Sequence, residues 1–204
     1  METTNLAYFL QTTKDELTAY LNEINQQQLI DAAELIVAAK KKKGRVHVTG
    51  IGKPSHVAEY IAALLSSTGT PTYFLDGTET IHGSAGQAEK GDVVIAISNS
   101  GETEELKKSL LTLKALGIKV IGVSGGIDSW LQKHSDAFLF AGITNEGDPL
   151  NKPPRISILA EIIVLQSLSI LLQQEAAIDI ADYYAWHPGG SLGSAIMQER
   201  SVEE

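Results

Sequence analysis

The chain contains no cysteine, so disulfide bonds, thiolate catalysis and cysteine-ligated zinc sites are excluded. It is also poor in basic residues: 16 Lys and Arg stand against 25 Asp and Glu, and the net charge is −9. The one basic cluster is Lys40–Lys43, followed by Arg45. We interpret it as the solvated end of a helix, where positive charge complements the helix dipole. No nucleic-acid partner is therefore expected.

Long apolar runs are missing as well. The longest, Ile156–Leu172, is interrupted by Glu161 and Gln166 and is too short to span a bilayer easily. The first ten residues, METTNLAYFL, have neither a basic segment nor a long apolar core, so no secretory signal is expected. The apolar fraction of 43% is sufficient for the core of one domain. These observations predict a soluble cytoplasmic protein with no membrane partner.

Hydrophobic periodicity predicts a change of structure near Gly44. Residues 5–43 have helical spacing, with a possible break at 25–28. Beyond them, short apolar runs alternate with helical segments, which predicts parallel strands buried on both faces. The expected strands are 45–49, 72–75, 92–98, 119–124 and 137–140, and the expected helices are 55–68, 102–116, 128–134 and 156–174. We therefore predict a three-layer α/β sandwich with a five-stranded parallel sheet. It forms a single domain, 1–204, with a helical segment 5–43 and an α/β core 44–198.

The most informative segment is Ser98–Thr103, with the sequence SNSGET, which follows the apolar run 92–97. A buried strand that ends in hydroxyl residues and Gly before a helix directs N–H and O–H groups at one point, which suits a phosphate. Glu102 is unexpected there, because a carboxylate beside a phosphate costs electrostatic free energy. Moving a proton on a phosphorylated substrate is one role that would account for it.

Four other segments carry candidate residues, and each also has a plain structural interpretation. Lys53 follows Gly50-Ile51-Gly52, a pattern that fits neither a Walker loop nor GxGxxG and that a simple glycine turn explains equally well. His82 fits a loop histidine bonded to backbone, and Glu146 a polar connection. His187, in Trp186–Gly193, fits a general acid or base, a helix cap or an oligomer contact.

Taken together, the motifs resemble a known family. The chain contains, in order, GIGKxxHVA, STGTP, a His-Gly loop, DVVIAISNSGE, an E-x-x-P-L loop and HPGGxLG. This series is similar to the sugar isomerase (SIS) domain of arabinose-5-phosphate isomerases, over roughly residues 30–197. Such isomerases often carry two further C-terminal domains of the cystathionine-β-synthase type, so the resemblance implies a stand-alone catalytic domain.

The resemblance implies an aldose–ketose isomerase of a phosphorylated sugar. The expected pair is arabinose 5-phosphate and ribulose 5-phosphate, interconverted through a cis-enediolate without a metal or other cofactor. The implied catalytic set is Lys53, Glu102, Glu146 and His187. The proton shuttle is Glu102 or Glu146, with the choice left open; Lys53 polarises substrate oxygens. His187 opens the sugar ring, reached from a neighbouring subunit of a homo-oligomer, a dimer or tetramer.

The implied substrate-binding residues lie in four of the motifs. They are Gly52, Ser55, His82, Ser98, Asn99, Ser100, Gly101, Thr103 and Arg155. Three departures from the family pattern leave the sugar uncertain: Pro54 stands where a Ser is usual, Ser84-Ala85 replaces Asp-Leu, and 154–159 replaces a Ser/Thr-rich stretch. Arg155 either pairs with Asp148 at the surface or reaches the phosphate. The alternatives are a non-catalytic phosphosugar-binding regulator and an isomerase of a different phosphosugar.

Overall fold

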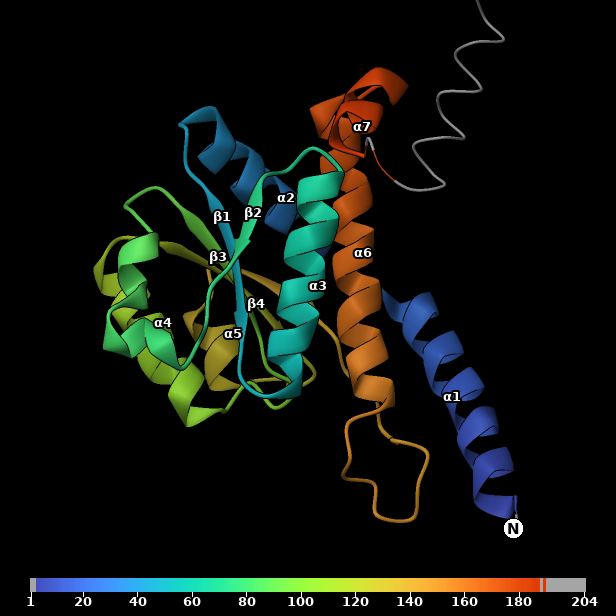
Figure 1. Ribbon diagram of the computed structural model, residues 1–204. Helices are drawn as coiled ribbons and strands as arrows, with labels where there is room; N and C mark the ends of the chain where they lie inside the picture. The colour runs from blue at the N-terminus through green and yellow to red at the C-terminus, as the bar shows by residue number, and fades with distance from the viewer. Residues whose placement is uncertain (1–2, 188, 190–204) are drawn as a thin grey trace, which may run out of the picture.

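The computed structural model describes residues 3–187 and 189, and it confirms the three-layer α/β sandwich (Figure 1). Its sheet has five parallel strands in the order β2-β1-β3-β4-β5. The strands are β1 Val46–Gly50, β2 Thr72–Phe74, β3 Val93–Ile97, β4 Lys119–Ser124 and β5 Ala137–Phe140. All five coincide with predicted strands to within two residues at either end.

The helices are α1 Thr4–Glu23, α2 Gln26–Lys41, α3 Lys53–Ser67, α4 Glu104–Ala115, α5 Trp130–His134, α6 Ile156–Ala176 and α7 Ile180–Trp186; two 3₁₀ turns are η1 Glu79–His82 and η2 Ser84–Gln87. Helices α2, α3 and α6 cover one face of the sheet, and α4 and α5 cover the other (Figure 1). Val46 and Val48 of β1 belong to the hydrophobic core under α2, α3 and α6, whereas Val94 and Ala96 of β3 belong to the core under α4 and α5. Alternate strand residues thus serve opposite faces, as expected for a buried parallel sheet.

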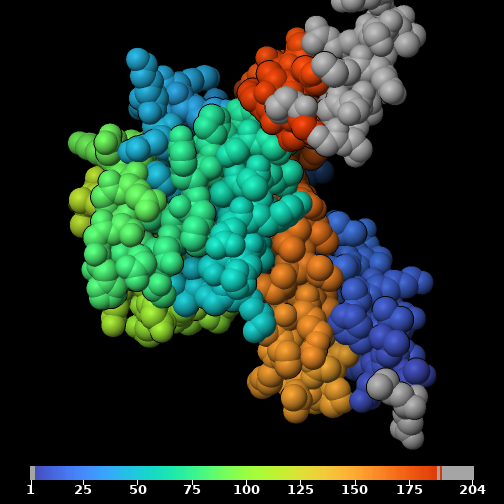
Figure 2. All heavy atoms as spheres, viewed as in Figure 1, coloured from blue at the N-terminus to red at the C-terminus, as the bar shows by residue number. Residues whose placement is uncertain are grey.

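The predicted break near residues 25–28 is confirmed and has a local cause. The side chain of Asn25 accepts hydrogen bonds from the backbone N–H groups of Gln27 and Gln28, which caps α2. Helix α1 ends before this cap and lies against α6 at the outside of the molecule (Figure 2). Tyr20 is its one buried residue.

Helix α6 is the one helix in the described part of the chain that is long and apolar enough to cross a membrane. Half of its apolar window is nevertheless buried inside the protein, where α6 packs against α1, α2 and α3. Length and apolar composition are equally typical of a core helix in a folded domain. We assign α6 to the core, because its buried residues belong to the cluster shared with α2, α3 and the sheet.

Candidate active site

The strand order reverses between β1 and β3, and two helices begin at that point. Gly50, the last residue of β1, lies beside Ile97, the last residue of β3. From these neighbours the chain leaves in opposite directions, into α3 on one face and α4 on the other. Ligands of open α/β sheets bind in the crevice at such a switch point, where helix N-termini attract anions. The segments 51–53 and 98–103 therefore flank the candidate site.

The turn Ser98–Thr103 is held in one shape by its own side chains. The Ser98 and Thr103 hydroxyls lie 3.0 Å apart, and the N–H of Glu102 donates to Oγ of Ser100 at 3.1 Å. Gly101 has φ of +69°, and a Cβ there would stand 2.4 Å from Oγ of Ser129. Only glycine satisfies both conditions without strain.

Hydrogen bonds join this turn to the end of β4. The carbonyl of Asn99 accepts from the N–H of Gly125 at 2.9 Å and from the hydroxyl of Ser124 at 3.2 Å. The side chains of Asn99 and Ser100 remain exposed at the start of α4. The turn thus presents polar groups to solvent from a base held by hydrogen bonds.

Across the switch point, α3 begins at Lys53. Gly52 has φ of +68°, and a Cβ on it would meet nothing within 4 Å, so this turn borders open space. Ser55 donates its hydroxyl hydrogen to the carbonyl of Gly52 at 2.6 Å, and Pro54 occupies the first turn without an N–H to satisfy. The Lys53 side chain is exposed at the helix start. The structure therefore brings Gly52, Lys53 and Ser55 to the same edge as Ser98–Thr103.

Glu102 has a structural role, linking two helices, that the sequence did not reveal. One carboxylate oxygen accepts from the N–H of Trp130 at 2.7 Å, at the start of α5, and the other lies 2.7 Å from Nζ of Lys107 on α4. Hydrogen bonds from Lys107 and from the Trp130 N–H hold the pKa of the Glu102 carboxyl below its ordinary value. This carboxylate links α4 to α5 and is a weaker base for that reason.

Glu146 is buried, and from the loop before α6 its side chain caps that helix. Its Oε2 accepts from the backbone N–H groups of Arg155 and Ile156, each at 2.7 Å, and of Ser157 at 3.2 Å. The N-terminus of a helix carries partial positive charge, so an anion is favourable there. All three bonds go to one oxygen, which leaves Oε1 for a different partner. The cap could not be read from the sequence, because Arg155 lies nine positions after Glu146.

Helix α1 holds the loop that carries Glu146. The carboxylate of Glu16 accepts from the N–H of Thr144 at 2.9 Å, and Nδ2 of Asn145 donates to the hydroxyl of Tyr8 at 2.8 Å. Gly147 has φ of +77°, and a Cβ on it would stand 2.7 Å from the ring of Phe9. The N-terminal helix therefore positions a candidate catalytic carboxylate.

Glu161 is a residue whose importance sequence reasoning missed. It lies on α6 with 0% exposure, and in the described part of the chain neither carboxylate oxygen has a hydrogen-bond partner. Burial, followed by the negative charge of Glu146, raises the pKa of Glu161 to about 8. The available signal was a single acidic residue inside the apolar run 156–172, which we interpreted only as an interruption of that run.

Two further predicted residues lie at the surface near this edge. The guanidinium of Arg155 pairs with the carboxylate of Asp148, the ion pair that was the plain structural alternative. His82 ends η1, which packs against α4, and its side chain is exposed. Both residues stay proposals as substrate contacts.

Within one chain, His187 lies far from the other predicted catalytic residues. It follows α7, at the opposite end of α6 from the Glu146 loop (Figure 1). Helix α6 has 21 residues, so its ends are about 30 Å apart. The His187 ring stacks on Tyr183, with centroids 4.1 Å apart, and Nδ1 lies 2.9 Å from the Tyr183 carbonyl oxygen. Residues 188 and 190–193 of the HPGGSLG motif lie outside the described residues.

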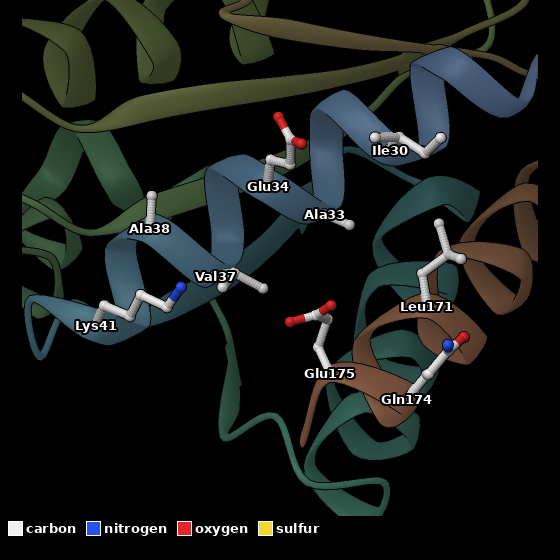
Figure 3. Close-up of a pocket in the computed structure, with 9 residues that line it drawn as sticks. All are labelled: Ile30, Ala33, Glu34, Val37, Ala38, Lys41, Leu171, Gln174 and Glu175. Carbon is white, nitrogen blue, oxygen red and sulfur yellow. The ribbon is translucent and has the colours of Figure 1, made fainter. Parts of the chain in front are cut away.

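Hollows also lie elsewhere on the described part of the molecule. A groove of about 490 Å³ between α2 and α6 (Figure 3) contains no predicted site residue; it is lined by Ile30, Ala33, Glu34, Val37, Ala38, Lys41, Leu171, Gln174 and Glu175. A second hollow, of about 560 Å³, borders Gly125 and Thr144, but α1 lines it with Asp15, Glu16 and Glu23, which repel an anionic ligand. Within residues 3–187 and 189, no group of three or more His, Asp or Glu is placed to hold a metal ion.

Comparison with curated proteins finds arabinose 5-phosphate isomerases among the relatives of this chain. Over 184 residues the chain is 38% identical to arabinose 5-phosphate isomerase KdsD of Pseudomonas aeruginosa, covering 90% of this chain and 55% of that protein. Over 195 residues it is 34% identical to a Haemophilus influenzae protein named as a probable arabinose 5-phosphate isomerase, covering 93% and 57%. The chain spans about half the length of the curated relatives it matches.

Solved structures agree with this fold. The Escherichia coli CFT073 protein c3406, solved in complex with arabinose 5-phosphate, is 32% identical, with a TM-score of 0.79 over 92% of this chain and 100% of that one. A candidate phosphosugar isomerase involved in capsule formation from Bacteroides fragilis is also 32% identical, with a TM-score of 0.84 over 91% and 96%. The family model of the SIS domain matches residues 40–170. The chain therefore belongs to the SIS domain family.

Proposed function

We propose that the protein is an aldose–ketose isomerase that interconverts arabinose 5-phosphate and ribulose 5-phosphate. One observation carries the proposal: the same sheet edge holds a hydroxyl-rich turn at the start of α4 and a buried carboxylate, Glu146, with one oxygen anchored by three N–H groups. A phosphosugar isomerase needs this combination of an anion site and a positioned base. The names of the curated relatives support the choice of substrate.

The phosphate is assigned to the turn Ser98–Thr103. The Ser100 hydroxyl accepts from the N–H of Glu102, so it keeps its own hydrogen to donate to a phosphate oxygen. The Thr103 hydroxyl bonds to Ser98 and does not cap α4, so the N–H groups at the start of the helix are available to an anion. Asn99 and Gly101 complete this binding turn, with Gly52, Ser55, His82 and Arg155 as the other proposed substrate contacts.

The proton transfer is assigned to Glu146. Its Oε1 takes the proton from C2 of the open-chain aldose, and the electrons of that C–H bond form the C1–C2 double bond of an enediolate. The proton then returns to C1, and the hydrogen on O2 moves to O1, so that O2 becomes the carbonyl oxygen. Lys53 stabilises the negative charge that develops on the substrate oxygens. Glu102 is the weaker candidate, because Lys107 and Trp130 already engage both of its oxygens.

Ring opening is assigned to His187 of a second copy, because the His187 of the same chain lies at the far end of α6. A site shared between two copies requires a homo-oligomer, which we propose is a dimer or tetramer. Its proposed location is the cytoplasm. The N-terminal helix supports self-association, since Leu6, Tyr8, Leu10 and Leu21 of α1 are each about half exposed. Large apolar side chains gathered on one exposed helix are typical of an interaction surface.

The test is an assay of the purified protein against a panel of pentose and hexose phosphates. We expect turnover of arabinose 5-phosphate. Glu146→Gln should lower kcat by about 10²–10⁴-fold, because it removes the base and keeps the shape of the side chain. Glu102→Gln, the matched variant at the other carboxylate, should cost less.

Four outcomes would contradict the proposal, or a part of it, in distinguishable ways. Wild-type rates in both variants would remove the carboxylates from the mechanism. Binding of phosphosugars without turnover would favour a regulatory domain. Turnover of a hexose phosphate alone would keep the isomerase and change its substrate. Light scattering that gives a monomer at micromolar concentration would exclude the shared site.

A further inference from the structure

Helix α6 carries a second carboxyl group close to the one that caps it. We propose that the protonation state of Glu161 sets the charge of the site beside Glu146: as a neutral acid it adds no negative charge there, and as an anion it repels the anionic substrate. The inference rests on the proposed function, in which Glu146 moves the proton. It adds a group that does not touch the substrate and that controls the pH range of the reaction.

Ser157 connects the two carboxyl groups geometrically. Its backbone N–H is one of the three donors to Oε2 of Glu146. Its side chain lies one helical turn before Glu161, and residues four apart share a helix face. The Ser157 hydroxyl and both Glu161 oxygens are buried, and none of them has a partner among the described residues. Among the described residues, the interior just below the cap thus holds a buried hydroxyl and a buried carboxyl without partners, and no positive charge acts on the carboxyl.

The surroundings favour the neutral form of Glu161. The titratable groups that act on it are Glu146 from the preceding loop and Tyr20 from α1, and neither supplies positive charge. Helices α2 and α3, which also pack on α6, contribute apolar side chains to this core. Burial and the Glu146 charge together raise the pKa of Glu161 to about 8, so the group is protonated at neutral pH and ionises just above it.

Ionisation of Glu161 opposes the reaction for an electrostatic reason. The substrate brings a phosphate dianion to the site beside Glu146. A second buried carboxylate there repels that dianion and weakens the binding of the substrate. The neutral acid has no such effect. A single proton on Glu161 therefore controls how strongly the site binds an anionic substrate.

The experiment compares the pH dependence of arabinose 5-phosphate isomerisation in the wild type, Glu161→Gln and Glu175→Gln. Glutamine keeps the shape of the side chain and cannot ionise. We expect kcat/KM of the wild type to fall about tenfold between pH 7 and pH 9, as one group with a pKa of about 8 loses its proton. This fall should disappear in Glu161→Gln. It should persist in Glu175→Gln, which removes the same charge from the far end of the same helix.

A second measurement keeps the inference independent of turnover. The affinity for inorganic phosphate is measured by calorimetry from pH 6 to 9.5, and the ratio between Glu161→Gln and wild type cancels the titration of phosphate itself. The ratio should rise above pH 8. If the wild type isomerises nothing, the proposed function fails, and this ratio still decides the inference. An unchanged alkaline fall in kcat/KM, or a flat ratio, would overturn it. Glu161→Leu replaces Glu161→Gln if the amide prevents folding.

Discussion

The stability of the protein should depend on pH through Glu161, and Glu161→Gln isolates this dependence. The ordinary pKa of a Glu is 4.5, and that of Glu161 in the folded chain is about 8. Between these values the folded state holds a proton that the unfolded state has released. As pH rises, the free energy of unfolding falls wherever the folded state binds more protons than the unfolded state. The contribution is therefore complete below pH 4.5 and is lost as pH rises through 8.

The magnitude follows from the two pKa values. One pKa unit corresponds to about 1.36 kcal/mol, so the wild type should lose about 3 kcal/mol by pH 7 and at most about 5 kcal/mol above pH 8. Glu161→Gln carries no ionisable group and loses none of this. The variant also changes the free energy of unfolding by a constant amount, because a buried amide replaces a buried acid. The change with pH, and not the offset, is the quantity to test.

Urea denaturation at pH 5, 6, 7, 8 and 8.5 measures it, at one protein concentration so that self-association is held constant. The free energy of unfolding of Glu161→Gln minus that of the wild type should rise by several kcal/mol across this range. Glu175→Gln, at an exposed position of the same helix, should follow the wild type. A difference that stays constant within about 0.5 kcal/mol would refute the reasoning, since it would mean that Glu161 ionises alike in both states.

Three further predictions concern the loops. Gly101→Ala should lower the free energy of unfolding by about 2–4 kcal/mol in urea titration, because φ is +69° and a Cβ meets Ser129; an unchanged midpoint would contradict it. Ser100→Ala should raise the dissociation constant for arabinose 5-phosphate about tenfold or more, since a hydrogen bond to a charged group contributes about 1.5–3 kcal/mol; equal calorimetric curves would remove this turn from the site. Arg155→Ser should change stability by less than about 1 kcal/mol, because an exposed ion pair with Asp148 contributes little, and should raise KM, because it removes a proposed substrate contact; an unchanged KM would leave Arg155 as a surface residue.

The fold was predictable from the sequence because its signals are local. Continuous β-branched runs such as 93–97 indicate strands buried on both faces, and the helical spacing between them indicates crossovers. Parallel strands place their carboxyl ends on one edge, so the loops after β1 and β3 could be assigned to one site before any coordinates. The break between α1 and α2 was equally local, since Asn25 caps the helix that follows it.

What only the tertiary structure decided depends on partners that are distant in sequence. Glu102 contacts Trp130, 28 residues later, and Tyr20 contacts Phe140, 120 residues later; periodicity carries no information on such pairs. The cap that Glu146 forms on α6 depends on the loop that precedes this helix. Glu161 is buried because α1, α2 and α3 pack on α6. The distance between His187 and the other candidates is likewise set by the length of α6 and by the direction in which α7 leaves it. Residue types identify candidate chemistry, whereas burial and pairing decide which groups hold a charge, and those are properties of the packed chain.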